Sequence, residues 1–205
     1  MFEIFEANYS RDSGPLGDGF NQSLIPDLAG LVHFFSKYGG GSFENGLYRT
    51  IRPADLPLWQ ERIGLGFPEL ENAVICFGYD WAGNVFALNT ERLMGGQPEI
   101  SFFEPGTGEV HPLPFDLRTF HERGLVDDCE AVLGESFYEE WRAAGGTVPA
   151  YDDCIGYRKP LFLGGKDDVQ NLEVCDLDVY WHILGQLIGQ TRGLPSGTFV
   201  RVNLD

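Results

Sequence analysis

Acidic side chains are concentrated in one stretch of the sequence, between Gly124 and Asp153, which contains a single basic residue, Arg142. Carboxylates at this density can act in pairs as general acids and bases, or they can attract a basic partner. The eight acids of this stretch are our candidate partner-binding residues: Asp127, Asp128, Glu130, Glu135, Glu139, Glu140, Asp152 and Asp153.

The spacing of these acids argues against acid–base catalysis. Several are adjacent in sequence, and adjacent residues on a helix point in different directions. A catalytic pair must instead converge in a cleft. Aromatic residues lie among the acids, namely Phe137, Tyr138, Trp141 and Tyr151. Two interpretations stay open: the rings are anchors for a basic partner with the acids as a rim, or they pack inward while the acids face water.

Motifs for other chemistry are not matched. Asp167 stands where a phosphate-binding loop has its Ser or Thr, and Glu44 stands where a nucleophile elbow around Ser42 needs glycine. The four histidines lack the H-E-x-x-H spacing, and the four cysteines follow no zinc pattern. The sequence therefore predicts no catalytic residue, no cofactor-binding residue and no metal site.

The overall charge narrows the class of partner. The 31 acidic and 14 basic residues give a net charge of −17, which repels phosphate backbones and anionic lipids. Such a surface attracts a basic protein instead. The first residues carry acids where a signal peptide has positive charge, and no run approaches the ~20 apolar residues of a membrane span. We expect a cytoplasmic protein with four free thiols, and neither nucleic acid nor membrane as its partner.

The pattern of apolar residues predicts the elements that must position the acids. Helical spacing predicts helices at 26–38, 54–63 and 176–190, with three short helices at 116–121, 127–133 and 137–144. Strands are predicted at 46–51, 73–77, 85–88, 99–103, 109–113 and 154–157. Short loops join antiparallel neighbours, so four or five of these strands form a meander.

These elements predict a single α+β domain. Its core is a central antiparallel sheet of about 4–6 strands with helices packed on it, followed by an amphipathic C-terminal helix. Residues 1–23 are polar and rich in turns, and we expect a loosely docked lead-in there, with the domain itself at 24–205.

Several motifs, in this order along the chain, resemble the SUKH superfamily. They are Tyr38-Gly39-Gly40-Gly41-Ser42-Phe43, then Gly46-Leu47-Tyr48-Arg49, then Phe77-Gly78-Tyr79-Asp80-Trp81-Ala82-Gly83-Asn84-Val85-Phe86-Ala87, then Pro105-Gly106-Thr107-Gly108-Glu109-Val110. The C-terminal block is similar to the C-terminal domain of type VI secretion immunity proteins, through Gly156-Tyr157-Arg158-Lys159-Pro160-Leu161-Phe162-Leu163-Gly164-Gly165, Asn171-Leu172-Glu173 and Tyr180-Trp181-His182-Ile183.

The resemblance implies a binding protein without enzymatic activity. Members bind and neutralise a toxin, often a nuclease, that is encoded beside them, and an acidic cover over a basic nuclease would also fit the charge of −17. The turns at 80–83 and 105–108 are expected to hold the fold. Two alternatives stay open: a housekeeping adaptor of the same fold, and an enzyme or small-molecule-binding protein without a recognisable motif.

Overall fold

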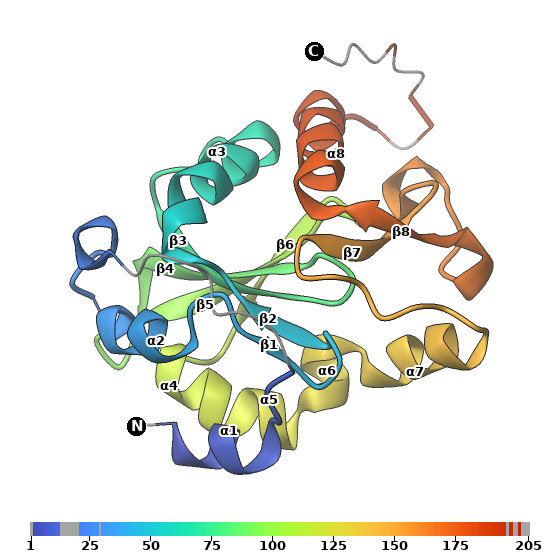
Figure 1. The fold of residues 1–205 in the computed structure, drawn as a ribbon. Coiled ribbons are helices and arrows are strands. Elements are labelled where there is room, and N and C mark those ends of the chain that lie inside the picture. Colours follow the sequence, from blue (N-terminus) through green and yellow to red (C-terminus); the bar gives the residue numbers. More distant parts are fainter. Residues whose placement is uncertain (1, 13–20, 29, 196, 199–200, 202–205) are drawn as a thin grey trace.

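The computed structural model describes residues 2–12, 21–28, 30–195, 197–198 and 201. At its centre lies a six-stranded antiparallel sheet whose strand order follows the chain (Figure 1). The strands are β1 (Ser42–Phe43), β2 (Tyr48–Thr50), β3 (Val74–Asp80), β4 (Val85–Met94), β5 (Gln97–Glu104) and β6 (Glu109–Leu113). The short connections produce the predicted meander, and the predicted α+β fold is confirmed.

A second, two-stranded antiparallel sheet consists of β7 (Asp153–Tyr157) and β8 (Leu172–Asp176). The backbone N–H of Ile155 donates to the carbonyl oxygen of Trp81 at 2.8 Å, which attaches this small sheet to the turn between β3 and β4. β7 is the strand predicted at 154–157. Its partner β8 was not predicted from the sequence.

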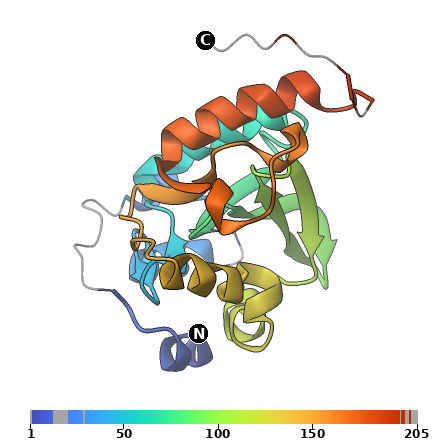
Figure 2. The same ribbon diagram turned by 90° about the vertical axis from the view of Figure 1, so that its right-hand side faces the viewer.

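Helices cover both faces of the main sheet. Figures 1 and 2 show α1, α2, α4 and α5 on one side and α3 and α8 on the other. The α-helices are α1 (Glu3–Asn8), α2 (Leu31–Tyr38), α3 (Leu56–Gly66), α4 (Leu117–Thr119), α5 (Leu125–Asp127), α6 (Cys129–Leu133), α7 (Glu135–Ala143) and α8 (Leu177–Thr191). A π-helical turn, η3 (Phe120–Gly124), joins α4 to α5, and four 3₁₀ turns are η1 (Gln22–Leu24), η2 (Pro53–Asp55), η4 (Leu161–Leu163) and η5 (Val169–Asn171).

The face toward α1 and α2 is packed with aromatic rings around one histidine. Phe77 of β3 contacts Phe120 of the π-helical turn with ring centroids 5.5 Å apart. His121 is fully buried among these rings. Its Nε2 lies 2.9 Å from the hydroxyl of Tyr48, and its Nδ1 lies 2.7 Å from the carbonyl oxygen of Leu117.

The partners of His121 fix its protonation. A carbonyl oxygen only accepts, so Nδ1 carries the proton and Nε2 accepts from the Tyr48 hydroxyl. Burial lowers the pKa of His121 to about 3, against the opposing hydrogen bond to Leu117. The ring is therefore neutral at physiological pH and serves the core.

The N-terminal segment packs more closely than expected. Phe5 of α1 is fully buried, and its ring lies 5.2 Å from that of His121. Asp12 accepts hydrogen bonds from the backbone N–H groups of Asn45 and Gly46 at 2.8 and 2.9 Å. Residues 2–12 are thus part of the core and not a loosely docked lead-in, because the spacing of Phe2, Phe5 and Tyr9 gives this short helix an apolar side. Residues 1 and 13–20 of the predicted lead-in lie outside the described residues.

On the opposite face, α3 and α8 approach each other closely. Gly185 and Gly189 of α8 permit this, since a Cβ on Gly189 would lie 2.5 Å from the carbonyl oxygen of Leu65 in α3. The amphipathic C-terminal helix predicted at 176–190 is α8, with Trp181 and Ile188 among its buried residues. The two helices are thereby closely packed against each other, and α3 also contacts β3.

Candidate partner-binding site

α3 places one tryptophan between the sheet and α8. Trp59, Ile63 and Gly66 are the buried residues of this helix, and their spacing puts them on one side. The ring of Trp59 stacks on Tyr79 of β3 at a centroid distance of 5.9 Å and meets Trp181 of α8 edge-on at 6.0 Å. Trp59 is therefore held in one orientation by rings from two other elements.

The loop at 149–153 forms the next wall and is fixed to the sheet by buried donors. Arg49 of β2 is fully buried and donates to the carbonyl oxygens of Pro149 and Asp153, at 2.9 and 3.1 Å. The hydroxyl of Tyr79 donates to the carbonyl oxygen of Tyr151 at 2.5 Å. These bonds position the side chains of Tyr151 and Asp152 before β7 begins.

The start of α8 supplies two further carboxylates. Asp176 caps the helix, because its side chain accepts from the backbone N–H of Val179 at 2.9 Å. Asp178 in the first turn accepts from Nε of Arg62 in α3 at 2.6 Å. The backbone N–H of Leu177 donates to the carbonyl oxygen of Asp152 at 2.9 Å, which joins the loop to the helix.

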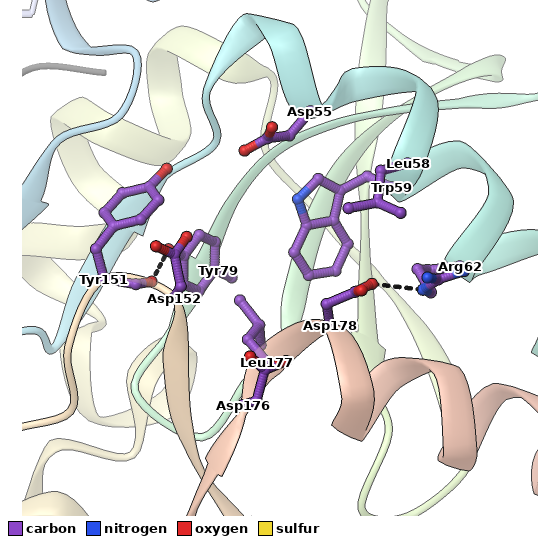
Figure 3. A pocket seen from close by; sticks show the side chains of 10 residues that line it. All are labelled: Asp55, Leu58, Trp59, Arg62, Tyr79, Tyr151, Asp152, Asp176, Leu177 and Asp178. Atoms are coloured by element: carbon purple, nitrogen blue, oxygen red, sulfur yellow. Dashed lines mark hydrogen bonds and ion pairs between the residues drawn. The ribbon is translucent and has the colours of Figure 1, made fainter. Parts of the chain in front are cut away.

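Together these elements enclose a small cavity, called here the aspartate pocket (Figure 3). Its volume is about 70 Å³. That space suits the end of one side chain, whereas sites for small molecules typically measure ~300–1,000 Å³. The lining residues are Asp55, Leu58, Trp59, Arg62, Tyr79, Tyr151, Asp152, Asp176, Leu177 and Asp178.

The pocket is negative and partly open to solvent. Four aspartates face one arginine in its lining, and the side chains of Asp152 and Asp178 are 68% and 48% exposed. Burial raises the pKa of Asp55, and the charges of Asp152 and Asp178 add to the rise, while Arg52 opposes it. A cation that enters this pocket would reduce the repulsion between its carboxylates, which favours the binding of a cation.

The indole N–H of Trp59 has no acceptor among the described residues. The other three tryptophans, Trp81, Trp141 and Trp181, donate to carbonyl oxygens at 2.7, 3.0 and 2.7 Å. For Trp59, which is 6% exposed, ring contacts are its only recorded interactions within the described part of the chain. Figure 3 shows its nitrogen on the side of the ring turned toward Asp55. Trp59 lines the cavity, and its Nε1 is not among the fully buried unpaired side-chain atoms of the described residues, so this donor is open to the cavity.

The eight acids predicted from the sequence do not converge. Asp152 lines the aspartate pocket, and Asp153 is half-buried at the first position of β7. The other six are exposed on α5, α6, α7 and the junctions between them: Asp127, Asp128, Glu130, Glu135, Glu139 and Glu140. Figures 1 and 2 place α6 and α7 on the side of the main sheet away from α3 and α8. Glu130 accepts from the backbone and hydroxyl of Ser136, at 2.9 and 2.8 Å, so it also serves the junction of α6 and α7.

Most aromatics between these acids pack inward, as one of the two interpretations predicted. Tyr138 is buried, stacks on Trp81 at 5.2 Å, and donates its hydroxyl to the carbonyl oxygen of Asn45. Phe137 meets Trp81 edge-on at 5.7 Å. Tyr151 differs, because its ring lines the aspartate pocket. Asp55, Trp59, Asp176 and Asp178 were not predicted from the sequence as site residues. The helix-capping pattern at Asp176 and the apolar side of α3 were the signals that could have found two of them.

A larger hollow, of about 240 Å³, lies between the β3–β4 turn, α6 and the small sheet. Burial raises the pKa of Asp80 in its wall to about 7, a value that suits acid–base chemistry. The Asp80 carboxylate, however, already accepts from the backbone of Ala82 and from the backbone and side chain of Asn84, at 2.9, 2.9 and 2.8 Å. Asp80 thus holds the turn at 80–83.

Neither a metal cluster nor a membrane span is found in the described ranges. No three His, Cys, Asp or Glu side chains there are grouped to hold a metal ion. No helix among the same residues is long and apolar enough to cross a membrane.

Comparisons with known proteins place this site in context. A search of curated proteins found no match. Among solved structures, "Crystal structure of Atu4351 from Agrobacterium tumefaciens" matches with a TM-score of 0.63 and 14% identity, covering 91% of this chain and 89% of that chain. At this identity the likeness shows the fold alone.

A family model matches the C-terminal part of the chain. The model describes the T6SS immunity protein Tdi1, C-terminal, and the match covers residues 122–188, about a third of the chain. It begins within the π-helical turn and ends in α8, so it contains Asp152, Asp176 and Asp178 but not α3. The wider resemblance to the SUKH superfamily stays a prediction, whereas the predicted resemblance to type VI secretion immunity proteins is confirmed over residues 122–188.

Proposed function

We propose that this chain is a non-enzymatic immunity protein that neutralises a toxin by binding it directly in the cytoplasm. The match of residues 122–188 to the C-terminal part of the T6SS immunity protein Tdi1 carries this proposal. The matched elements hold all eight predicted acids and the α8 wall of the aspartate pocket. A housekeeping adaptor of the same fold has no comparable observation in its favour.

The toxin is basic, and a nuclease fits best. With a charge of −17 the chain presents to a protein the same sign of charge that nucleic acid presents. A nuclease needs a basic cleft to hold phosphates, so an acidic cover competes for that cleft.

The exposed acids of α5–α7 guide the toxin into contact. Exposed charges act mainly on the association rate, and salt screens them. Neutralising three of them should lower the association rate constant about fivefold at low salt and by less at high salt. Stopped-flow mixing checks this with a triple variant, Asp128→Asn/Glu139→Gln/Glu140→Gln, and a control triple on other elements, Glu3→Gln/Glu91→Gln/Glu109→Gln. Equal loss in both variants would show that only net charge matters.

Co-expression tests the function itself. The chain is expressed with the reading frame encoded beside it, and cell survival and co-purification are measured. Rescue of growth together with a stable complex supports an immunity protein. A toxic neighbour that this chain neither binds nor neutralises would contradict the proposal. A harmless neighbour and no complex would favour the adaptor.

A further inference from the structure

The aspartate pocket has the features of a site for one charged side chain. Its 70 Å³ admits no more than the end of a side chain, and its floor is aromatic. Trp59, Tyr79 and Tyr151 offer ring surface to a cation, while carboxylates border the opening.

The charges of the pocket are incompletely balanced by the protein's own arginines. Arg62 binds Asp178, and Arg52 binds Asp152 at 2.7 Å. Asp55 has only a longer contact to Arg52, at 3.7 Å. Its carboxylate therefore lacks a short ion pair within the described residues, although its side chain is 35% exposed.

At the edge of the pocket, an arginine of this chain already makes the kind of contact that we expect from an arginine of a partner. The guanidinium of Arg52 lies 3.9 Å from the ring centroid of Tyr151 and binds both carboxylate oxygens of Asp152, at 2.7 and 3.2 Å. A planar cation that stacks on a ring and forks onto a carboxylate is characteristic of arginine and not of lysine.

The unpaired N–H of Trp59 points to a second group on the same ligand. An indole N–H needs an acceptor, and guanidinium has none. A backbone carbonyl beside the basic side chain would supply it. The required ligand therefore combines a cation with an amide carbonyl, which is what an arginine residue within a polypeptide presents.

We infer that the aspartate pocket receives an arginine of the protein partner, with its guanidinium against Asp55 and a backbone carbonyl on Nε1 of Trp59. The partner's identity as a toxin rests on the proposed function, whereas the chemistry of the pocket does not. Buried arginines in aromatic pockets are typical interface hot spots, so this contact governs how slowly the complex dissociates.

The pocket can be tested on the full chain without any toxin. The probe is N-acetyl-arginine N-methylamide, which carries both required groups, and the readout is the indole N–H resonances of the ¹⁵N-labelled protein. The Trp59 resonance, assigned through Trp59→Phe, should shift and saturate with the probe. Two matched probes separate the groups: the citrulline analogue keeps the carbonyls without the charge, and methylguanidinium keeps the charge without a carbonyl. Both should bind at least about tenfold more weakly.

Isosteric variants locate the effect. Asp55→Asn should weaken binding of the arginine probe about tenfold, because it removes a carboxylate while leaving the shape unchanged. Glu91→Gln, at an exposed position of β4, should leave binding unchanged. Asp55→Asn keeps the test decisive even if Trp59→Phe does not fold. Equal affinity for the arginine and citrulline probes would overturn the inference. An Asp55→Asn variant that binds the arginine probe as tightly as the wild type would overturn it too.

Binding to the toxin separates this inference from the proposed function. In the complex, Asp55→Asn should raise the dissociation rate about tenfold, and the control Glu91→Gln should change it less than about threefold. Tight toxin binding that is indifferent to Asp55→Asn would refute the pocket and leave the immunity function standing. If the protein binds the arginine probe but does not bind the toxin, the immunity function alone would be refuted.

Discussion

The two faces of the main sheet differ in whether the polar groups of their buried side chains are hydrogen-bonded within the protein. On the face toward α1 and α2, His121 is fully buried and both of its ring nitrogens are bonded, to Tyr48 and Leu117. On the face toward α3 and α8, Trp59 is almost as deeply buried, yet its indole N–H has no acceptor within the described residues. The first face is complete without a partner, while the second borders an acidic cavity.

The difference separates residues that hold the fold from residues that are available for binding. The Trp59 N–H opens on the aspartate pocket, where an acceptor can reach it, whereas both ring nitrogens of His121 are bonded inside the core. On the same face as Trp59, burial raises the pKa of Asp55, and the charges of Asp152 and Asp178 add to the rise. We therefore propose that the face toward α3 and α8 is the one that contacts a partner.

The largest effect is expected from breaking the satisfied face. His121→Ala removes a fully buried ring and leaves the Tyr48 hydroxyl and the Leu117 carbonyl without their partner. We expect the free energy of unfolding to fall by about 3–4 kcal/mol. Urea denaturation measures this, with His111→Ala as the control, because the His111 side chain is 46% exposed. Comparable losses in the two variants would show that His121 is not the centre of this core.

The next effect is a loss of stability at acidic pH. Burial lowers the pKa of His121 to about 3, whereas the unfolded chain titrates near the ordinary 6.5. Below pH 6.5 the unfolded state gains a proton that the folded state does not, so stability falls as the pH falls. His121→Gln retains a donor and an acceptor without titrating. Between pH 7 and 4.5 the wild type should lose about 2.5 kcal/mol more than this variant, measured by urea denaturation at each pH. Parallel pH profiles would contradict a buried neutral His121.

Local patterns in the sequence predicted much of the fold. The meander follows from short turns, and α8 follows from apolar residues at helical spacing. α1 was missed, because a six-residue helix is marginal by itself and forms here only as Phe5 enters the core. β8 was missed since it pairs with β7 across an intervening segment of 14 residues, 158–171, a contact that no local pattern encodes.

The candidate site was predictable only in part, for a related reason. Asp55, Trp59, Tyr79, Asp152 and Asp178 come from segments far apart in the chain, and the tertiary fold alone brings them together. Charge density in sequence therefore selected the α5–α7 acids, which the fold spreads along exposed helices. Only Asp152 belongs to both sets.

The smallest expected effect is the difference in stability between two tryptophan variants on the same face of the sheet, the face toward α3 and α8. Trp181 and Trp59 contact each other, are 0% and 6% exposed, and lose the same atoms on replacement by phenylalanine. Trp181→Phe also leaves the carbonyl oxygen of Gly83 unpaired, whereas Trp59→Phe removes a donor that has no acceptor. We expect losses in unfolding free energy of about 2–3 kcal/mol for Trp181→Phe and about 1 kcal/mol for Trp59→Phe. Urea denaturation at one pH measures both. An equal loss would mean that the Trp59 N–H already has a partner in solution, and the aspartate pocket would then lack its open donor.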